Sequence, residues 1–507
     1  MNAEFALRTL IFLPVISFPF IYLLGRSSLR MSLTKDKMRN PARWLALAVM
    51  AVLLIPLTTV IIKFLQGESI QTMIGGIKLQ MDGISILLSL VVVVMCFLVI
   101  LFSGDYMKDE VGEEKYYALL VCMAGMVIGM VTTTDLFNLW IWFEAMAITP
   151  YVLVAFYHDR APALEAGVKY LFQSAVGTML VLVGIIIVYS QTGSLCITHE
   201  CAAAIPMTPA IISAGVLFII GFGVKSALVP MHTWLPDAHS QAPSGISAIL
   251  SGVVIEAGLI AMLRALDLIS GAFTQAGTFL IAFSVANILI GNIFALRQQQ
   301  IKRMLAYSSI SHMGYIVLGL GITMRFGVVN GAQGAFFHIF THALMKGLAF
   351  MAVGALMHAY AKPKSDAHAP LMLDDLNGIA KRYPPLAFIL TIALLSLAGL
   401  PPLAGFMSKW QIFVAGFETG NTTMIFIVIF AALNSVLSLA YYAPLINRMY
   451  RLKPSHLLSQ AGKVTLTMNI VFYILTVLII LIGMFPNILE PFTAEAAHVI
   501  LDAFVHP

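Results

Sequence analysis

LFIIGFGVKSALVP, residues 217–230, is apolar almost throughout, yet it contains Lys225 and ends at Pro230. A second stretch, LAGLPPLAGFMSKW (residues 397–410), combines two adjacent prolines and two glycines with Lys409. Proline and glycine leave backbone groups without helical partners, which a membrane span tolerates only in a protein-lined or hydrated interior. The two stretches therefore predict transmembrane helices that are interrupted beside a buried lysine.

The composition of the whole chain is typical of an integral membrane protein. Of its 507 residues, 60% are hydrophobic and 10% are charged, and the mean hydropathy is +0.93. Globular proteins carry roughly 25% charged residues, so this chain cannot cover a water-facing surface. The net charge of +5 comes from short loops and not from a nucleic-acid-binding face. Four cysteines exclude a disulfide scaffold, and no CxxC pair indicates an iron–sulfur or zinc site. No GxxxxGK[ST] or GxGxxG motif indicates a nucleotide site.

Fourteen segments have the roughly 20 mostly apolar residues that a spanning helix needs. They lie at 8–25, 43–66, 80–104, 116–134, 136–157, 165–190, 210–230, 243–269, 275–296, 303–323, 330–357, 384–416, 424–447 and 465–488. We therefore predict an all-α polytopic membrane protein of about 14 transmembrane helices in a single membrane domain, 1–507.

The interrupted helices are the seventh and the twelfth, five spans apart, which suggests two inverted five-helix repeats. The repeats would be helices 4–8 and helices 9–13. The resulting units are the N-terminal helices 1–3 at 1–110, the repeats at 116–269 and 275–450, helix 14 at 465–488, and a short outer tail at 489–507.

The distribution of lysine and arginine predicts the orientation. Loops on one side of the membrane carry twenty of these residues, and loops on the other carry five. Basic loops stay in the cytoplasm. We therefore expect both termini on the outer, periplasmic side of a bacterial or archaeal inner membrane. No small-residue cleavage site follows the span at 8–25, so we expect it to be retained.

Nine titratable residues inside the predicted spans are candidates for a buried functional site. A charge at the centre of a bilayer costs about 3 to 10 kcal/mol or more, so it persists only where it is paired, hydrated or functional. The nine are Glu144, Lys169, Lys225, Glu256, His312, His338, His342, Lys346 and Lys409. Three of them, His338, His342 and Lys346, recur every four residues and so share one helical face.

Two interpretations of these residues compete. They could pair to hold helices together, but polar contacts between spans contribute only about 0.6 kcal/mol on average, which does not account for so many. A series of Glu, Lys and His can instead pass a proton, because each group can bind and release one. Arginine, which cannot release a proton, is absent from the set. We favour a proton relay, with no catalytic, cofactor-binding or metal-binding residue in this chain.

Other polar clusters are weaker candidates. His232, Asp237 and His239 in PMHTWLPDAHSQAP (230–243) match no standard zinc spacing, so we expect no metal there. Cys196 and Cys201 lie in an outer loop and could form a disulfide, which the sequence leaves open.

Four motifs resemble the antiporter-like subunits of respiratory complex I, of Mrp-type cation/proton antiporters and of energy-converting membrane hydrogenases. They are KSALVPMHTWLPDAHSQAPSGISAILSG (225–252), RMLAYSSISHMGY (303–315), HIFTHALMKGLAFMAVGAL (338–356) and SLAGLPPLAGFMSKW (396–410). The resemblance implies fourteen helices in two inverted five-helix repeats, broken helices 7 and 12, and a central hydrophilic axis.

The resemblance also implies roles for individual residues. Glu144 and Lys225 match the pair that is thought to gate proton transfer in the family, and Lys409 matches its terminal helix-12 residue. The central relay corresponds to His312, His338 and His342. One departure is Glu256 in VVIEAGL (253–259), where the family usually has a lysine. A carboxylate can also carry a proton, or it could bind a cation.

Three functions remain open, and we favour the first. The chain would be a proton-translocating subunit of a redox-driven complex, in contact with lipid and with other membrane subunits, including homologous ones. Flavin and iron–sulfur clusters would then lie in partner subunits, with no cofactor in this chain and no nucleic-acid partner. The second function is a subunit of an Mrp-type Na⁺/H⁺ antiporter without a redox partner, which Glu256 as a cation ligand mildly favours. The third is a structural subunit that docks a catalytic arm.

Overall fold

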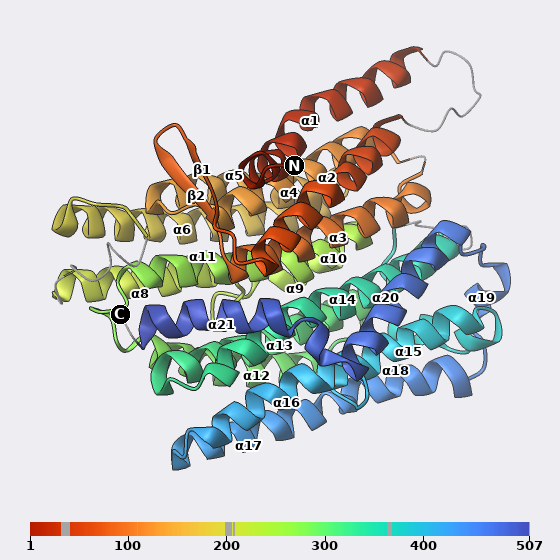
Figure 1. Ribbon diagram of the computed structural model, residues 1–507. Coiled ribbons are helices and arrows are strands. Elements are labelled where there is room, and N and C mark those ends of the chain that lie inside the picture. The colour runs from red at the N-terminus through yellow and green to blue at the C-terminus, as the bar shows by residue number, and fades with distance from the viewer. Residues whose placement is uncertain (32–40, 109, 198–204, 206–207, 362–367, 506–507) are drawn as a thin grey trace.

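The computed structural model describes the whole chain except residues 32–40, 109, 198–204, 206–207, 362–367 and 506–507. Its described part is an elongated bundle of helices that run roughly side by side (Figure 1). The helices of the first half are α1 (Ala3–Met31), α2 (Pro41–Leu65), α3 (Gly83–Tyr106), α4 (Glu113–Thr132), α5 (Leu136–Val154), α6 (Ala161–Thr192), α8 (Pro209–Lys225), α9 (Trp234–Gln241), α10 (Ser244–Ile249), the π-helical turn η1 (Leu250–Val254) and α11 (Ile255–Leu268).

The second half is also helical. Its helices are α12 (Ala276–Leu296), α13 (Ile301–Phe326), α14 (Val329–Tyr360), α15 (Pro384–Ala398), α16 (Ala404–Glu418), α17 (Thr422–Leu437), α18 (Leu439–Arg451), α19 (His456–Gln460), α20 (Leu466–Met484) and α21 (Glu490–Phe504). Short 3-10 turns occupy Leu373–Leu376, Ile379–Lys381 and Pro486–Ile488. Two strands, β1 (Ile70–Ile74) and β2 (Ile77–Met81), form an antiparallel hairpin.

Twelve helices in the described ranges are long and apolar enough to cross a membrane. Two shorter apolar helices, α8 and α15, fall in the predicted seventh and twelfth spans. Both spans are interrupted, as their prolines and glycines predicted: α8 ends at Lys225 and is followed by α9, and α15 ends at Ala398 and is followed by α16. The proline- and glycine-containing stretches that predicted the interruptions are the residues at which these helices end.

The two breaks are closed by specific contacts. The Trp234 indole donates to the Val224 carbonyl oxygen at 2.7 Å, and so satisfies a group left without a partner at the end of α8. At the second break, Gly399 takes a φ of 81°, which glycine adopts without steric cost. The peptide bonds Val229–Pro230 and Pro401–Pro402 are cis.

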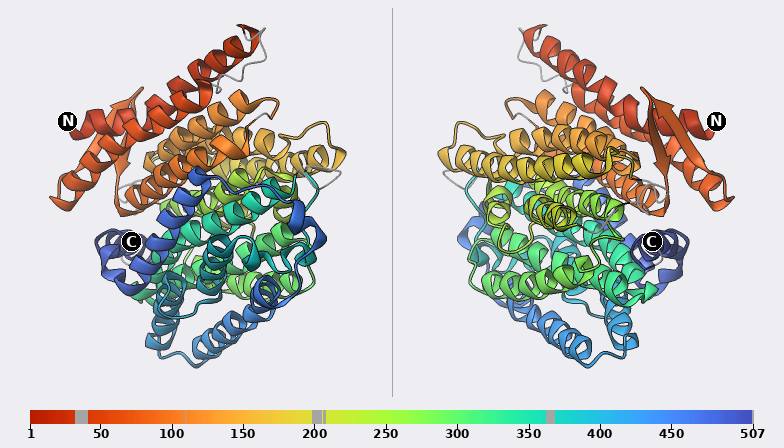
Figure 2. Two further views of the ribbon diagram at one scale, coloured as in Figure 1. Left: turned by 90° about the vertical axis from the view of Figure 1, so that its right-hand side faces the viewer. Right: turned by 90° about the vertical axis from the view of Figure 1, so that its left-hand side faces the viewer.

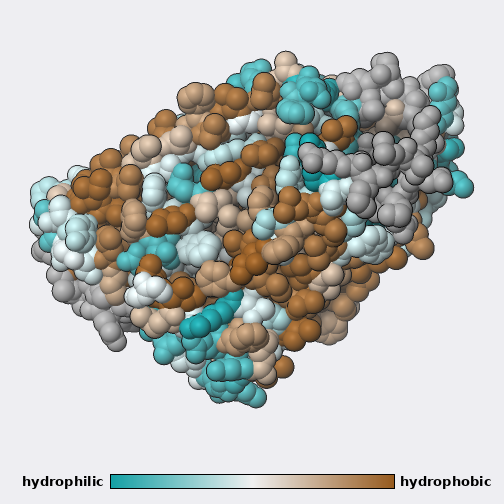
Figure 3. Space-filling view, turned by 90° about the horizontal axis from the view of Figure 1, so that it is seen from above, coloured by the Kyte–Doolittle hydropathy of each residue, from teal (hydrophilic) through white to brown (hydrophobic). Residues whose placement is uncertain are grey.

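The most buried helices occupy the centre of the bundle. Every residue in the most apolar part of α14, and of the segment Ser244–Leu268, is buried. Seen along the bundle, α1 and α2 lie at one edge and α17 and α18 at the other (Figure 2). Large apolar side chains are exposed on the outer helices, including Phe172 on α6 and Phe426 on α17. Hydrophobic patches cover much of the face seen from above (Figure 3), as expected for contact with lipid or other subunits.

The bundle has two distinct ends. One end carries the loops that are rich in lysine and arginine and is here called the basic end. Glu110, Arg160 and His368 line a common cavity there. At the opposite end, Arg8 donates to Thr72 of the hairpin at 2.7 Å. Val505 lies beside Gly327 at that end too, so both chain ends lie on the same side of the bundle.

The residues after the last predicted span form a helix, which sequence reasoning did not foresee. This helix, α21, packs against α3 and α14 and continues the path of α20. Phe472 of α20 contacts Phe102 near the end of α3, while Ala496 of α21 lies against Gly83 at its start. The absence of a side chain at Gly83 allows the two backbones to approach closely.

Candidate proton-transfer axis

The first part of the site lies at the break between α8 and α9. Lys225 is the last residue of α8 and is fully buried. Its ammonium donates to the Tyr151 hydroxyl at 2.9 Å and lies over the rings of Phe143 and Tyr151 at 4.7 and 4.9 Å. The negative end of the α8 dipole favours a positive charge at this position.

Glu144, the predicted partner of Lys225, follows Phe143 in α5. One of its carboxylate oxygens is buried and has no hydrogen-bond partner among the described residues. Lys225 binds the Tyr151 hydroxyl one to two turns further along α5. The structure therefore places the carboxylate and the ammonium in the same region, with the hydroxyl and not the carboxylate in contact with Lys225.

Lys169 lies apart from the buried residues. Its side chain is 47% exposed on α6, where it binds Glu165 at 2.6 Å and Asp237 at 3.3 Å. Asp237 also binds Arg303 at 2.8 Å, which joins α6, α9 and α13 in one network of ions. The sequence correctly indicated a charge within a span, but the spacing did not reveal that it faces outward from this chain.

The central part of the site begins at Glu256, just after the π-helical turn η1. Such turns are frequent at functional sites because they locally change which side chains face a neighbour. Glu256 Oε1 and His342 Nδ1 form a hydrogen bond of 2.8 Å, and both side chains are fully buried. The second carboxylate oxygen of Glu256 and Nε2 of His342 have no partner among the described residues.

Three histidines continue the path from Glu256. The rings of His342 and His312 stack with centroids 5.1 Å apart. His312 Nδ1 lies 2.9 Å from His338 Nε2, and His338 Nδ1 lies 2.7 Å from the Ser408 hydroxyl. Hydrogen bonds and ring contacts thus connect Glu256 of α11 with Ser408 of α16.

Lys409 lies at the second break, next to Ser408. Its ammonium donates to the Leu397 carbonyl oxygen at 2.9 Å and to the Ser435 hydroxyl at 3.0 Å, and it lies 4.7 Å from the Tyr315 ring. Leu397 is in the last turn of α15, where carbonyl groups lack helical partners and attract a cation. Both breaks therefore hold a buried lysine near the end of a half-helix.

Lys346 is one turn from His342 on α14. It donates to the Leu305 carbonyl oxygen at 2.8 Å and to the Ser308 hydroxyl at 2.6 Å. The nine predicted residues thus fall into two groups and one separate residue. The first group is Glu144 and Lys225 at the first break. The second group runs from Glu256 through the three histidines to Lys409, with Lys346 beside it, and Lys169 lies apart and faces outward.

The weaker candidates do not form a site with this axis. Asp237 is engaged by Lys169 and Arg303, while His239 stacks on Phe350. No cluster of three or more His, Cys, Asp or Glu side chains in the described part of the chain could hold a metal ion. Cys196 is disulfide-bonded, and Cys201 lies outside the described residues.

The sequence itself matches a known family over most of its length. Residues 133–435 match the family described as NADH:quinone oxidoreductase/Mrp antiporter, TM, and residues 69–117 match NADH-ubiquinone oxidoreductase (complex I), chain 5 N-terminus. The chain belongs to this family. It is an integral, multi-pass membrane protein, as the recognised motifs indicated.

Relatives in the NADH:quinone oxidoreductase/Mrp antiporter family include subunits of redox complexes. The F420H2 dehydrogenase subunit N of Methanosarcina mazei is 33% identical over 395 residues, covering 77% of this chain and 78% of the relative. The NADH-quinone oxidoreductase subunit N of Desulforudis audaxviator is 31% identical over 382 residues, covering 74% and 73%.

Solved structures show the same fold. A chain of the archaeal membrane-bound sulfane sulfur reductase matches with a TM-score of 0.86 and 29% identity, covering 99% of both chains. A chain of the Mrp complex from Dietzia matches with a TM-score of 0.85 and 21% identity, covering 100% of this chain and 99% of that one. The second likeness concerns the fold alone.

Proposed function

We propose that this chain is a proton-translocating subunit of a redox-driven, complex I-like membrane complex of the NADH-quinone oxidoreductase or membrane-hydrogenase type. The observation that carries the proposal is the series of buried contacts from Glu256 through His342, His312 and His338 to Ser408. Each of these groups can donate or accept a proton. Hydrogen bonds join the series except between His342 and His312, whose rings stack, and there we propose a bridging water.

The proposed transfer begins at the first break. Glu144 and Tyr151 exchange places as the partner of Lys225, which changes whether its ammonium retains its proton. The proton then passes to Glu256 and on to His342. Gly258 brings α11 against the backbone of Lys225, and we propose that water bridges the gap from Lys225 to Glu256.

The later steps use the histidines and the second break. His312 and His338 relay the proton to Ser408, whose hydroxyl can accept one proton as it releases another. Lys409 then receives it and releases it toward the outer side. We propose that the two broken paths complete fourteen membrane crossings, with helices 4–8 and 9–13 as inverted repeats.

Lys169 has a different role in this scheme. Its ion pair with Asp237 ties α6 to α9, the half-helix beyond Lys225. We propose that the exposed Lys169–Glu165 pair meets a neighbouring subunit and transmits its state to the first break. The partners are other membrane subunits, including homologous ones, and the electron-carrying flavin and iron–sulfur clusters lie in partner subunits.

The direct test is proton transport by the reconstituted complex. Lys225→Ala and Lys409→Met should each lower the number of protons moved per turnover while the complex still assembles. The matched control is Lys381→Met, because Lys381 is an exposed lysine at the basic end and not part of the axis. Unchanged proton transport in both axis variants would contradict the relay, and loss of assembly without a selective loss of transport would favour a structural subunit.

The alternative is a subunit of an Mrp-type Na⁺/H⁺ antiporter with no redox partner. Glu256 favours it, because one of its buried carboxylate oxygens has no hydrogen-bond partner among the described residues and could bind a cation. Purification of the native complex in mild detergent discriminates the two. Flavin, iron and quinone-reductase subunits would establish a redox-driven complex. Small membrane proteins without flavin or iron, together with sodium-dependent transport, would establish an antiporter.

A further inference from the structure

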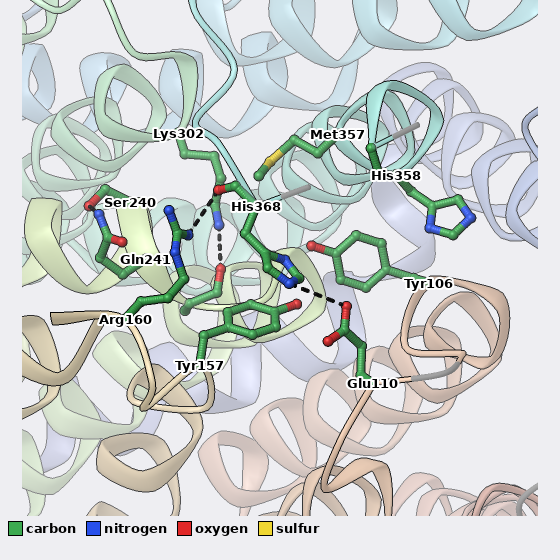
Figure 4. Close-up of a pocket in the computed structure, with 12 residues that line it drawn as sticks. Tyr106, Glu110, Tyr157, Arg160, Ser240, Gln241, Lys302, Met357, His358 and His368 are labelled. Carbon is green, nitrogen blue, oxygen red and sulfur yellow. Dashed lines mark hydrogen bonds and ion pairs between the residues drawn. The ribbon is translucent and has the colours of Figure 1, made fainter. Parts of the chain in front are cut away.

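A small cavity at the basic end lies outside the axis described above. Its volume is about 60 Å³, which is room for more than one water molecule. Figure 4 shows Glu110 and His368 facing each other across the cavity, with His368 Nε2 and the carboxylate 3.7 Å apart. His358 and Tyr106 also line it. Because the His368 and Glu110 side chains are 31% and 26% exposed, protons from the surrounding water can reach these groups.

Lys302 forms the inner wall of this cavity. It lies in the first turn of α13, its side chain is 1% exposed, and its ammonium donates to the Ala242 carbonyl oxygen, as Figure 4 shows. A buried ammonium that contacts a neutral carbonyl group is costly unless it can be hydrated or lose its proton. The cavity supplies that hydration, because Lys302 is one of the residues that line it.

Lys302 belongs to the first turn of α13, and Lys346, on α14, contacts the next turn of α13. Lys346 donates to the Leu305 carbonyl oxygen and the Ser308 hydroxyl. Leu305 is only three residues from Lys302, which is about 4.5 Å along the helix axis. The inner wall of the cavity therefore lies roughly one helical turn from the group to which Lys346 is bound.

His239 lies at the junction of these two lysines. It is fully buried, and neither ring nitrogen has a hydrogen-bond partner among the described residues. Its ring stacks on Phe350, one turn beyond Lys346 on α14, with centroids 4.7 Å apart. Lys302 binds the carbonyl oxygen of Ala242, three residues after His239, and Phe350 lies four residues after Lys346, so the packing brings the ring near both lysines. Leaving two imidazole nitrogens unpaired in a protein interior costs free energy, which indicates a function for them.

We propose that this cavity is a second proton-uptake site, in which Lys302 takes a proton from cavity water and His239 passes it to Lys346. Hydronium gives a proton to the neutral amine of Lys302 and leaves water. The resulting ammonium protonates one nitrogen of His239, and the other nitrogen releases its proton to the amine of Lys346. No electron moves in these steps. This inference rests on the proposed function, because Lys346 adjoins His342 on the central relay.

This site is independent of the first break. Protons taken up through Lys302 reach α14 without crossing the gap between Lys225 and Glu256. Because Glu256 stands where the family usually has a lysine, the charge at the far side of that gap is different in this chain. An uptake site beyond the gap gives the central histidines a separate supply of protons. The chemical species recognised is a hydrated proton.

The test uses the reconstituted complex and two conservative variants. Lys302→Arg keeps the charge but cannot release a proton, and His239→Phe keeps a ring that stacks on Phe350. Each should lower the protons moved per turnover by up to about twofold without abolishing transport, because the altered step slows about 100-fold while the first break and the homologous subunits continue. The matched control, Lys381→Arg at the same end, should retain full transport.

A labelling experiment supports the test if a variant fails to fold. Gln241 lines the cavity, whereas Cys96 and Cys122 are buried. A cationic thiol reagent applied at the basic end should modify Gln241→Cys and lower proton transport, while the same reagent on Lys381→Cys should not. Full transport in Lys302→Arg and in labelled Gln241→Cys would overturn the inference. If Lys225→Ala still lowered transport in that case, the proposed function would stand; if it did not, both would fail.

Discussion

Glu256 is the residue at which this chain departs from the pattern that its motifs lead one to expect, and its contacts explain how a carboxylate serves there. One oxygen binds His342, and the other is buried without a partner among the described residues. A lysine at this position would be a third cation close to the central histidines, after Lys346 and Lys409. In the proposed relay, the carboxylate instead offers an acceptor at the point where the proton would enter the histidine series.

We predict that Glu256→Gln blocks this step. Glutamine preserves the shape and the hydrogen bond to His342 but cannot ionise, so proton transfer at this step should slow by about 100-fold or more. The measurement is protons moved per turnover in liposomes. Glu418→Gln, at an exposed carboxylate that binds Asn330, is the control, and equal transport by the two variants would reject the assignment.

An ion pair at the opposite end predicts a pH dependence of stability. Asp82 and Arg264 lie 2.7 Å apart and join the start of α3 to α11. Burial alone raises the pKa of Asp82, but the Arg264 guanidinium and the Ser85 hydroxyl outweigh it and lower the pKa below its usual value. Because the folded-state pKa is lowered, the pair stabilises the fold above a pH of about 4, and this stabilisation is lost as the pH falls further.

Thermal unfolding of the complex in mild detergent checks this prediction. Asp82→Asn should cost about 3 kcal/mol at neutral pH, because it removes the carboxylate that the largely buried Arg264 guanidinium binds at 2.7 Å. The difference in melting temperature between wild type and variant should shrink as the pH approaches about 3. A difference that does not change with pH would show that the ion pair is not responsible.

The sequence revealed buried charges better than it revealed where they point. Lys225, Glu256 and Lys409 could be predicted because a charge within an apolar span is costly. Lys169 satisfied the same criterion, yet it faces outward, since the face that a helix buries depends on its neighbours. Lys302 was counted with the loop residues, and only the packing of α9 on α13 shows that it is buried.

At the scale of elements, the breaks could be predicted and the end of the chain could not. Pro230, Pro401 and Pro402 interrupt runs that are otherwise apolar, and local chemistry alone dictates this. The helix α21 carries Glu490 and Pro491 in its first turn and is too short to span, so it resembles a tail by composition. Its place depends on Gly83, a contact distant in sequence.

We predict that Gly83→Ala loosens α21. An added Cβ would lie 2.5 Å from the Ala496 backbone nitrogen, and backbone cannot move aside as a flexible side chain can. The expected loss in the free energy of unfolding is about 1 to 3 kcal/mol, seen as a lower melting temperature and as faster proteolysis within α21. Gly462→Ala is the control, because its added Cβ would be no closer than 3.5 Å to its neighbours. Equal effects of the two substitutions would contradict this packing.

At the scale of the whole molecule, the two ends of the bundle differ in charge, and this difference predicts orientation. Val111 is 91% exposed at the basic end, and Met73 is 56% exposed on the hairpin at the other. Because basic loops stay in the cytoplasm, a membrane-impermeant thiol reagent should label Val111→Cys only from the cytoplasmic side. The same reagent should label Met73→Cys only from the outer side. The reverse pattern would place the cavity outside.

Across the molecule, the account depends on an unbroken path between the two broken helices. In the series described, His338 is the single link between His312 and Ser408. Its Nε2 lies 2.9 Å from His312 Nδ1, and its Nδ1 lies 2.7 Å from the Ser408 hydroxyl. The most direct measurement is therefore proton transport by the reconstituted complex carrying His338→Gln. We predict that the complex assembles and its driving reaction proceeds, while the protons moved per turnover fall to the level of the Lys409→Met variant. Transport equal to wild type in His338→Gln would contradict the account.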